Sequence, residues 1–404
     1  MRNLKIFAFF LILAAFALIH EPAAAKRPKT AEAEQTRPPK RYAWEEQRDS
    51  LLPLTDMVLC YGGSHHRNPY RWDRKRLTPY VTYTDREGKE HWLFDSFLCL
   101  EFVSEKRFDG QAYSYGVGYN GLSAGKKQWQ ELIDYWFADN SGVNALEKTV
   151  GEAAQRLGAP ATKRKVVMVI PDPIIYRQWK DTTSTTAYWG SLDERPLDFA
   201  SGEDRVAAAK WFVDRVRERF DQANYRYIEL AGFYLISEDI VTPNEGWSYE
   251  LKKSDEFVPG IAEYVHALNE RLCWIPYNRA AGYKAMWYKL GVDYACMQPN
   301  HYWDDKGERP LSRYFADLKR YPRLGMEFEF EESLVEGHPN CEVYKARFRE
   351  YMANAKKYGI YGTRPLSYYH GTNGFYDLWA SPAEKDRELY HEFCRFVIDN
   401  PLRK

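Results

Sequence analysis

Residues 227–239, YIELAGFYLISED, form an almost unbroken apolar run that stops at Ser237, Glu238 and Asp239. So little alternation between polar and apolar residues is typical of a strand buried on both faces, as strands of a parallel sheet are. The abrupt change to polar and acidic residues marks the end of the run. The segment therefore predicts a buried parallel strand that presents Glu238 where it emerges.

Seven further runs share this character, at residues 57–61, 93–102, 166–170, 272–276, 294–297, 326–330 and 360–369. A hairpin turning at residues 85–88 is expected before the second run. Between the runs, apolar residues recur at helical spacings of three and four. These patterns predict helices at residues 73–80, 126–157, 206–220, 257–268, 281–290, 311–320, 344–358 and 382–398.

Eight strands alternating with helices predict an α/β fold, a single (β/α)8 barrel of the TIM type with long βα loops, over residues 51–404. A doubly wound open sheet also alternates strands and helices, but it usually has fewer strands and often a glycine-rich phosphate turn. Residues 116–118 (GVG) are too isolated to form such a turn. The single barrel is therefore the expected architecture.

The first 50 residues differ in composition from the rest of the chain. Arg2 and Lys5 precede an apolar run at residues 6–19, and alanines at residues 23–25 suit a cleavage point, so residues 1–25 are expected to be a signal peptide. That run is shorter than the ~20 residues needed to span a bilayer, and no later run is long enough, so no transmembrane segment is expected. Residues 26–50 are charged and proline-rich, which predicts a linker or extension. The protein is expected to be exported, periplasmic or secreted.

The composition narrows the class of partner. The 57 Lys and Arg residues balance the 57 Asp and Glu residues, and this argues against nucleic acid, which needs a concentrated positive field. Aromatic residues make up 16% of the chain. They either line a surface for the apolar faces of sugar rings or fill a large core. A carbohydrate partner is therefore expected, while the sequence leaves protein partners unknown.

Known cofactor and metal motifs do not occur. The six cysteines lack CxxC spacing and are expected to be mostly buried thiols, with one or two disulfides possible in an exported protein. His65 and His66 are adjacent, so in an extended segment they point in opposite directions. HExxH, EF-hand and GxSxG patterns are missing too. We therefore expect neither a metal nor an organic cofactor.

Active sites of such barrels lie at the carboxyl ends of the strands. Glu238 follows the fourth apolar run. In the seventh, GMEFEFE at residues 325–331, alternation places Glu327, Glu329 and Glu331 on one face and the phenylalanines on the other. Two carboxyl groups facing one bond are what glycoside hydrolysis requires. The alternative is that Glu238 is a solvated loop acid and the others form a structural ion cluster.

Other polar and aromatic residues also stand in or just after the predicted strands, where they suit hydrogen bonds to sugar hydroxyls and stacking on sugar rings. The candidate substrate-binding residues are Asp95, Glu101, Asp172, Tyr234, Tyr277, Asn278, Gln298, Asn300, His301, Tyr302, Trp303, Tyr369 and His370. Long aromatic-rich loops at residues 103–125, 171–201 and 239–255 are expected to wall a cleft.

Four of these segments carry a resemblance: LFDSFLCLEF (93–102), GFYLISED (232–239), QPNHYW (298–303) and GMEFEF (325–330). Together they resemble an uncharacterised domain-of-unknown-function family found in secreted proteins of polysaccharide-degrading bacteria, over most of residues 55–400. More loosely, the glutamates resemble those of retaining glycosidase barrels. That likeness implies Glu238 as acid/base and Glu329 as nucleophile, with Glu327 as the other candidate. It departs from those enzymes at Ser237, where they usually have Asn.

The leading hypothesis is a secreted glycoside hydrolase that uses two carboxylates, with a retaining mechanism favoured. A non-catalytic carbohydrate-binding barrel is the first alternative, because the same residues could bind hydroxyls. Another carbohydrate-active enzyme, such as a polysaccharide lyase with Tyr369 or His370 as base, is the second.

Overall fold

The computed structural model describes residues 54–62, 71–104, 112–118, 121–240, 249–278, 280, 290–321 and 324–403. Several predictions lie outside these residues: the signal peptide, the linker, the helix at residues 281–290, His65, His66 and much of two mouth loops. Within the described part, no helix is both long and apolar enough to cross a bilayer.

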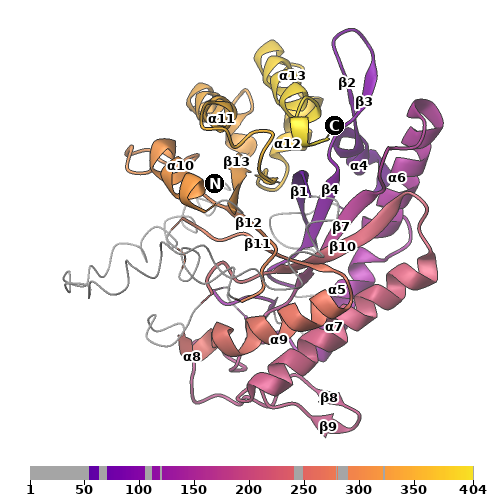
Figure 1. Cartoon of the computed structure of the whole chain (residues 1–404), viewed down its shortest axis with the longest axis vertical. Coiled ribbons are helices and arrows are strands. Elements are labelled where there is room, and N and C mark those ends of the chain that lie inside the picture. The colour runs from indigo at the N-terminus through magenta and orange to yellow at the C-terminus, as the bar shows by residue number, and fades with distance from the viewer. Residues whose placement is uncertain are drawn as a thin grey trace, which may run out of the picture. The chain divides into compact units, whose positions relative to one another are not determined.

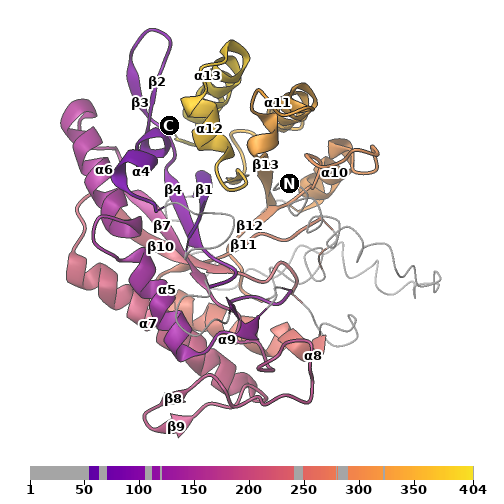
Figure 2. The same cartoon turned by 180° about the vertical axis from the view of Figure 1, so that it is seen from behind.

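Eight parallel strands close into a barrel, as predicted, with the helices outside it (Figure 1 and, from behind, Figure 2). Along the chain the strands are β1 (Asp56–Tyr61), β4 (Ser96–Leu100), β7 (Arg164–Ile170), β10 (Ile228–Leu235), β11 (Arg271–Trp274), β12 (Tyr294–Met297), β13 (Leu324–Glu329) and β14 (Leu366–Tyr369). Closure runs through β1, because Met57 is in register with both Ser96 of β4 and Ser367 of β14.

The outer layer consists of α4 (Arg74–Val81), α5 (Lys126–Trp136), α6 (Gly142–Leu157), α7 (Gly202–Ala223), α8 (Tyr249–Lys252), α9 (Ser254–Ala267), α10 (Leu311–Arg320), α11 (Cys341–Lys357), α12 (Gly374–Ala380) and α13 (Glu384–Ile398), with short 3-10 turns η1 (Glu332–Leu334) and η2 (Pro401–Arg403). The single helix expected at residues 126–157 is two helices. Gly142 has φ +53°, and a Cβ there would lie 2.3 Å from the carbonyl oxygen of Trp136. The break at this position therefore requires glycine.

The predicted hairpin is present as β2 (Thr82–Thr84) and β3 (Glu90–Trp92), antiparallel around the turn at residues 85–88. The last strand is shorter than predicted. Its expected first residues instead form turns that close α11, where the backbone N–H of Ile360 donates to the carbonyl of Ala355 at 2.9 Å. An apolar run alone does not distinguish a strand from the buried turn that leads into it.

Side-chain alternation in β13 positions the acidic residues. Phe328 packs on Tyr351 of α11 and Phe396 of α13, at 5.4 and 5.3 Å between ring centroids. Because neighbouring side chains of a strand point to opposite faces, Glu327 and Glu329 leave β13 on the face opposite Phe328. The core therefore places carboxyl groups on the barrel side of β13.

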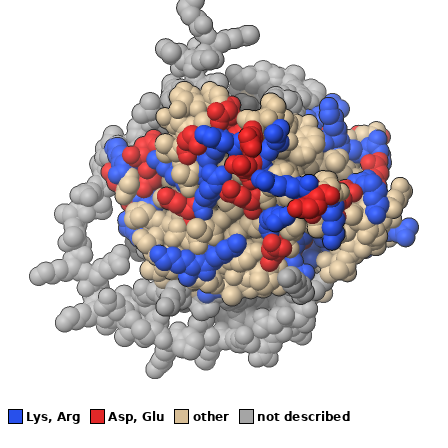
Figure 3. Space-filling view, turned by 90° about the horizontal axis from the view of Figure 1, so that it is seen from above, with Lys and Arg blue, Asp and Glu red and all other residues tan. Residues whose placement is uncertain are grey.

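Lys, Arg, Asp and Glu side chains are interspersed on the face shown in Figure 3. Ion pairs link neighbouring outer elements, such as Arg349 of α11 with Glu392 of α13 at 2.7 Å and Arg395 of α13 with Glu87 of the hairpin at 3.4 Å. Each of the six cysteines is a buried thiol.

Candidate active site

Glu238 follows β10 at the carboxyl end of the barrel and is half-buried. Gln298, just after β12, donates its side-chain amide to Oε1 of Glu238 at 3.3 Å and to the carbonyl of Ile275 at 3.1 Å. An isolated bridge pairs Gln298 with Tyr277, which extends the sheet beyond β11 and β12. Glu238 is thus connected to the segment that follows the sixth barrel strand.

Glu329, the last residue of β13, is buried with 1% of its surface exposed. Asn300 donates to its Oε1 twice, from the backbone N–H at 3.0 Å and from the side-chain amide at 3.3 Å. The hydroxyl of Tyr351 donates to Oε2. Asn300 is held in the left-handed conformation (φ +53°), and its Oδ1 accepts from the amide of Asn278 at 2.7 Å. Three donors therefore converge on one carboxyl group.

The two acids influence each other electrostatically. Burial raises the pKa of Glu329 to about 8, against the opposing effects of Tyr351 and Asn300, and the charge of Glu238 raises it further. Glu327 is also buried, and burial together with the charges of Glu329 and Glu238 holds its pKa well above the usual range. A carboxyl group is harder to ionise when a nearby carboxylate already carries a negative charge. The ionisation of Glu238, Glu327 and Glu329 is therefore coupled.

Aromatic rings line another part of the barrel mouth. Phe102 stacks on Tyr61 at 6.2 Å, Tyr61 meets Tyr369 edge-on at 5.9 Å, and Tyr369 meets Trp303 at 5.7 Å. We call these four residues the aromatic arc. Tyr369 is in register with Glu329 on the neighbouring strand, so the arc adjoins the acids. Half-buried Tyr369 and Trp303 suit the apolar face of a sugar ring.

Two residues in the loop after the sixth barrel strand point toward outer elements and not, as predicted, into the barrel mouth. His301 contacts the outer helix, because its Nε2 lies 2.6 Å from Oε2 of Glu350, and its Nδ1 lies 3.0 Å from the carbonyl of Arg309. Tyr302 is fully buried, with its hydroxyl 2.9 Å from Oγ of Ser333. Both residues fix the loop to η1 and α11, so the prediction that they bind substrate is corrected.

His370 also requires correction. It is 1% exposed, its Nε2 donates to the carbonyl of Leu59 at 2.8 Å, and burial lowers its pKa to about 4. Its ring lies against Trp72 and Tyr80, behind β14. A buried neutral imidazole whose Nε2 proton is already donated is unsuited to act as the base of a lyase.

The two predicted acids of the second strand lie at opposite ends of β4. Asp95 precedes β4, so it lies at the amino end of the barrel, where its Oδ1 accepts from the backbone N–H of Asp56 at 3.1 Å. Glu101 follows β4 at the correct end but is fully buried, and its Oε1 accepts from the N–H groups of Phe102 and Val103 at 2.6 and 3.3 Å. Tyr234 is buried within β10, nearer the barrel interior than Glu238.

Asp172 follows β7 and lines a separate narrow pocket with Ser237, Asp239 and Lys252. Glu238, Glu327 and Glu329 do not line this pocket. Of the predicted site residues, the fold therefore brings these six together: Glu238, Glu327, Glu329, Gln298, Asn300 and Asn278. Tyr277, Trp303 and Tyr369 lie beside them.

Four residues near the acids were not predicted to be functional. Tyr61 ends β1 and Phe102 follows β4, so their position at strand ends was the available signal. Tyr351 lies in the middle of α11, and Arg309, which lowers the pKa of Glu329, lies in the loop before α10. For these two, nothing in the local sequence indicates proximity to the barrel mouth.

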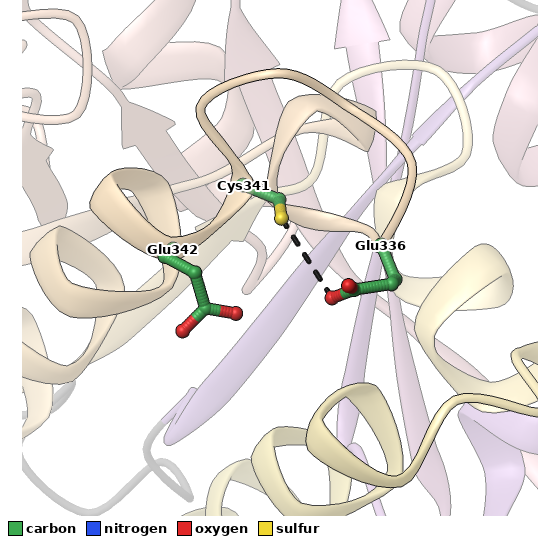
Figure 4. Close-up of side chains that lie close together, drawn as sticks. All are labelled: Glu336, Cys341 and Glu342. Carbon is green, nitrogen blue, oxygen red and sulfur yellow. Dashed lines mark hydrogen bonds between the residues drawn. The ribbon is translucent and has the colours of Figure 1, made fainter.

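One group of three metal-ligand side chains occurs among the described residues: Glu336, Cys341 and Glu342 (Figure 4). The Nζ of Lys345 lies 3.1 Å from Oε2 of Glu336 and 3.4 Å from Oε1 of Glu342, and it pairs with the buried Asp386 at 2.7 Å. An ammonium group already supplies the positive charge, so this group is a structural ion cluster.

The model of a family described as a domain of unknown function (DUF4855) matches residues 56–395. No curated protein matches the chain.

Solved structures share only a distant likeness. A D-psicose 3-epimerase determined in the presence of D-fructose is 14% identical, with a TM-score of 0.36, 84% of this chain covered and 99% of the other. A Schiff-base-forming fructose-1,6-bisphosphate aldolase is 12% identical, with a TM-score of 0.27 and coverage of 58% and 78%. A Xaa-Pro dipeptidase with bound methionine is 10% identical, with a TM-score of 0.27 and coverage of 85% and 75%.

Proposed function

The chain belongs to the DUF4855 family, whose function is unknown, and we propose that it is a secreted glycoside hydrolase with Glu238 and Glu329 as its catalytic pair. The hydrolysis of a glycosidic bond needs one carboxyl group to protonate the leaving oxygen and a second to attack the anomeric carbon or activate water. The pair lies at the carboxyl ends of the fourth and seventh barrel strands, where active sites of this fold occur.

One observation carries the proposal: residues 298–300 connect the two acids. Gln298 donates to Glu238, and Asn300, two residues later, donates twice to Glu329. A three-residue segment whose ends bind two different carboxyl groups keeps them in a defined relation to each other. A fixed geometry of this kind is what a two-carboxylate mechanism requires.

The contacts favour different roles for the two acids. Glu238 is half-buried and can exchange protons with solvent, as an acid/base must. Glu329 is buried and accepts from Asn300 and Tyr351, donors that stabilise its ionised form. The transition state is oxocarbenium-like, so positive charge beside Glu329 would offset the cost of desolvating its carboxylate. Glu329 is therefore the proposed nucleophile, and the mechanism is retaining.

The proposal is tested by the variants Glu238→Gln and Glu329→Gln, assayed for new reducing ends on a panel of polysaccharides. Each variant should lose about 10²–10⁴-fold in turnover, the usual contribution of a positioned acid or base. Glu194→Gln is the matched control, because Glu194 is exposed in the turn between β8 (Ser191–Leu192) and β9 (Arg195–Pro196). Wild-type turnover that survives both active-site substitutions would reject the assignment.

A non-catalytic carbohydrate-binding barrel is the second candidate. It is favoured by the burial of Glu327 and Glu329, which are 2% and 1% exposed, because carboxyl groups so enclosed can serve structure alone. Glycan retention in affinity gels, together with no cleavage of any panel member by the wild type, would support it. Cleavage that Glu238→Gln abolishes while retention persists would exclude it.

Export is part of the proposal and rests on residues 1–25. Expression of the full chain in a bacterial host should yield a periplasmic or secreted protein whose amino terminus lies near residue 26. Mass spectrometry of the purified protein measures this directly, and a cytoplasmic product that retains residues 1–25 would contradict it.

A further inference from the structure

The loop after β12 contains a positively charged residue that the proposed mechanism does not yet use. Arg309 precedes α10 and is half-buried, and its Nη1 donates to the backbone carbonyl of Asn300 at 3.2 Å. The backbone N–H of the same Asn300 donates to Oε1 of Glu329 at 3.0 Å. Arg309 is therefore linked to the proposed nucleophile through a single residue.

Asn300 is fixed at several points. Its N–H is directed to Glu329 and its carbonyl to Arg309, while its Oδ1 accepts from Asn278 at 2.7 Å. A residue with φ +53° needs such support, because residues other than glycine rarely adopt the left-handed conformation. Loss of the guanidinium would release the carbonyl of Asn300, and its donors to Glu329 would lose part of their alignment.

The backbone of Arg309 is anchored on both sides. Its N–H donates to Oδ2 of the buried Asp304 at 2.7 Å, and its carbonyl lies 3.0 Å from Nδ1 of His301. The other ring nitrogen of His301 lies 2.6 Å from Oε2 of Glu350 on α11. The side chain of Arg309 therefore extends toward Asn300 from a point that the loop and α11 hold in place.

The charge of Arg309 also acts on Glu329. Burial raises the pKa of this carboxyl group to about 8, and the guanidinium opposes that rise. The other titratable groups that neighbour Glu329 are Glu238 after β10, Glu327 on β13, Tyr351 on α11 and, in register on β14, Tyr369. Of all these groups, Arg309 is the one that carries a positive charge.

We infer that Arg309 is a positioning residue for the proposed nucleophile, because it orients Asn300 toward Glu329 and supplies the positive charge that favours the carboxylate. The inference rests on the proposed function and adds a residue to its machinery. It gives Arg309 two effects that can be separated, one of geometry and one of charge. Lysine would keep the charge but not the planar guanidinium with its fixed donors.

A purely structural role is the alternative. Arg309 would then only hold the loop together through its bond to Asn300. Its replacement would cost the same stability whether or not Glu329 is ionised. The two roles therefore differ in their dependence on pH, since an interaction with the carboxylate disappears when Glu329 is protonated.

A double-mutant cycle distinguishes these roles without requiring turnover. Arg309→Met, Glu329→Gln and the double variant are unfolded in urea at pH 5 and pH 9, on either side of the Glu329 pKa of about 8. Arg309→Met should lower the unfolding midpoint more in the wild type than in the Glu329→Gln background, and this difference should be larger at pH 9 than at pH 5. A difference that is the same at both pH values would overturn the inference.

The pH dependence of kcat/KM tests the same residue in the reaction. In Arg309→Met, the rise of kcat/KM with pH should move to higher pH by roughly half to one unit, because Glu329 ionises less readily. The maximum should fall about tenfold, because Asn300 is held less well. Arg309→Lys should restore the pH profile without restoring the full maximum. An unshifted profile in Arg309→Met would also overturn the inference.

Arg313→Met is the matched control, because Arg313 is exposed in the first turn of α10. This variant should alter neither the cycle nor the pH profile, and thermal melting establishes that each variant folds. If the pH-dependent difference is found but no glycan is cleaved, the hydrolase proposal fails and the effect of Arg309 on Glu329 stands. If glycans are cleaved but the difference does not depend on pH, the hydrolase stands and the positioning role fails.

Discussion

Asn300 donates both its backbone N–H and its side-chain amide to the same oxygen of Glu329, at 3.0 and 3.3 Å. The side chain can reach because Asn300 has φ +53°, which directs both donors toward β13. Asparagine tolerates this conformation better than most residues. The loop after one barrel strand therefore positions the acid of the next.

Asn300→Gly keeps the backbone conformation and removes the side-chain amide, both as donor to Glu329 and as acceptor from Asn278. We expect kcat/KM on a cleaved glycan to fall about tenfold, the value of one hydrogen bond to a charged group. Asn224→Gly is the matched control, since Asn224 is also left-handed (φ +46°) but exposed at the end of α7. An equal loss in both variants would indicate a general effect of glycine on the fold.

The pH dependence of kcat/KM should reflect Glu329. Burial raises its pKa to about 8, and a nucleophile acts only in its ionised form. Activity limited by this group therefore rises with pH through about 8. An activity that instead falls through that range would mean that Glu329 is the proton donor and would exchange the two proposed roles.

The same raised pKa predicts a change in stability. The folded state binds the Glu329 proton more tightly than the unfolded chain does, so this group's contribution is complete below its unfolded pKa of about 4.5 and is lost as pH rises through about 8. The free energy of unfolding of Glu329→Gln, relative to the wild type, should therefore increase from pH 5 to pH 8. Urea titrations at the two pH values measure it, and a difference that does not change with pH would count against the shifted pKa.

The aromatic arc should contribute to glycan binding. Tyr369→Ala and Trp303→Ala each remove a half-buried ring beside the acids, and we expect affinity for oligosaccharide to fall roughly threefold to tenfold. Tyr358→Ala is the control, because Tyr358 follows α11, is 41% exposed and stacks on Phe315 of α10. Affinities that remain unchanged in both arc variants would place the sugar elsewhere.

Lys345 should contribute strongly to the free energy of unfolding, because it is the cation of the structural ion cluster. Its buried ammonium pairs with the buried Asp386, and Lys345→Met would leave that carboxylate without a cation, at a cost of about 3–5 kcal/mol. Lys385→Met removes an exposed partner of the same cluster and should cost less than about 1 kcal/mol. Thermal melting compares the two variants. A rise in the Tm of the wild type on adding zinc would contradict the interpretation of Glu336, Cys341 and Glu342 as a structural ion cluster.

The strands could be predicted because barrel strands buried on both faces leave long apolar runs, and β7, β10 and β13 lie where such runs occur. The boundaries were less certain. The run at residues 93–102 begins before β4, so Asp95, which we predict within the strand, lies just before it at the amino end.

The site was only partly predictable. Glu238, Gln298 and Glu329 follow from strand ends, but a strand end does not indicate whether the next side chain turns toward the mouth or toward an outer helix. His301, Tyr302 and His370 all turn away. Tyr351 reaches Glu329 from a helix 22 residues later, a contact that only the folded chain creates.

Pairing of β1 with β14 has a consequence for biogenesis. Asp56, the first residue of β1, accepts from the hydroxyl of Tyr368 at 2.6 Å and from the amide of Asn400 at 3.2 Å, so residues more than 300 positions later stabilise the first strand. A growing polypeptide on the ribosome keeps one side of β1 open until residue 369 has emerged. Closure of the barrel therefore requires β14, so every intermediate that lacks this strand leaves one edge of β1 unpaired.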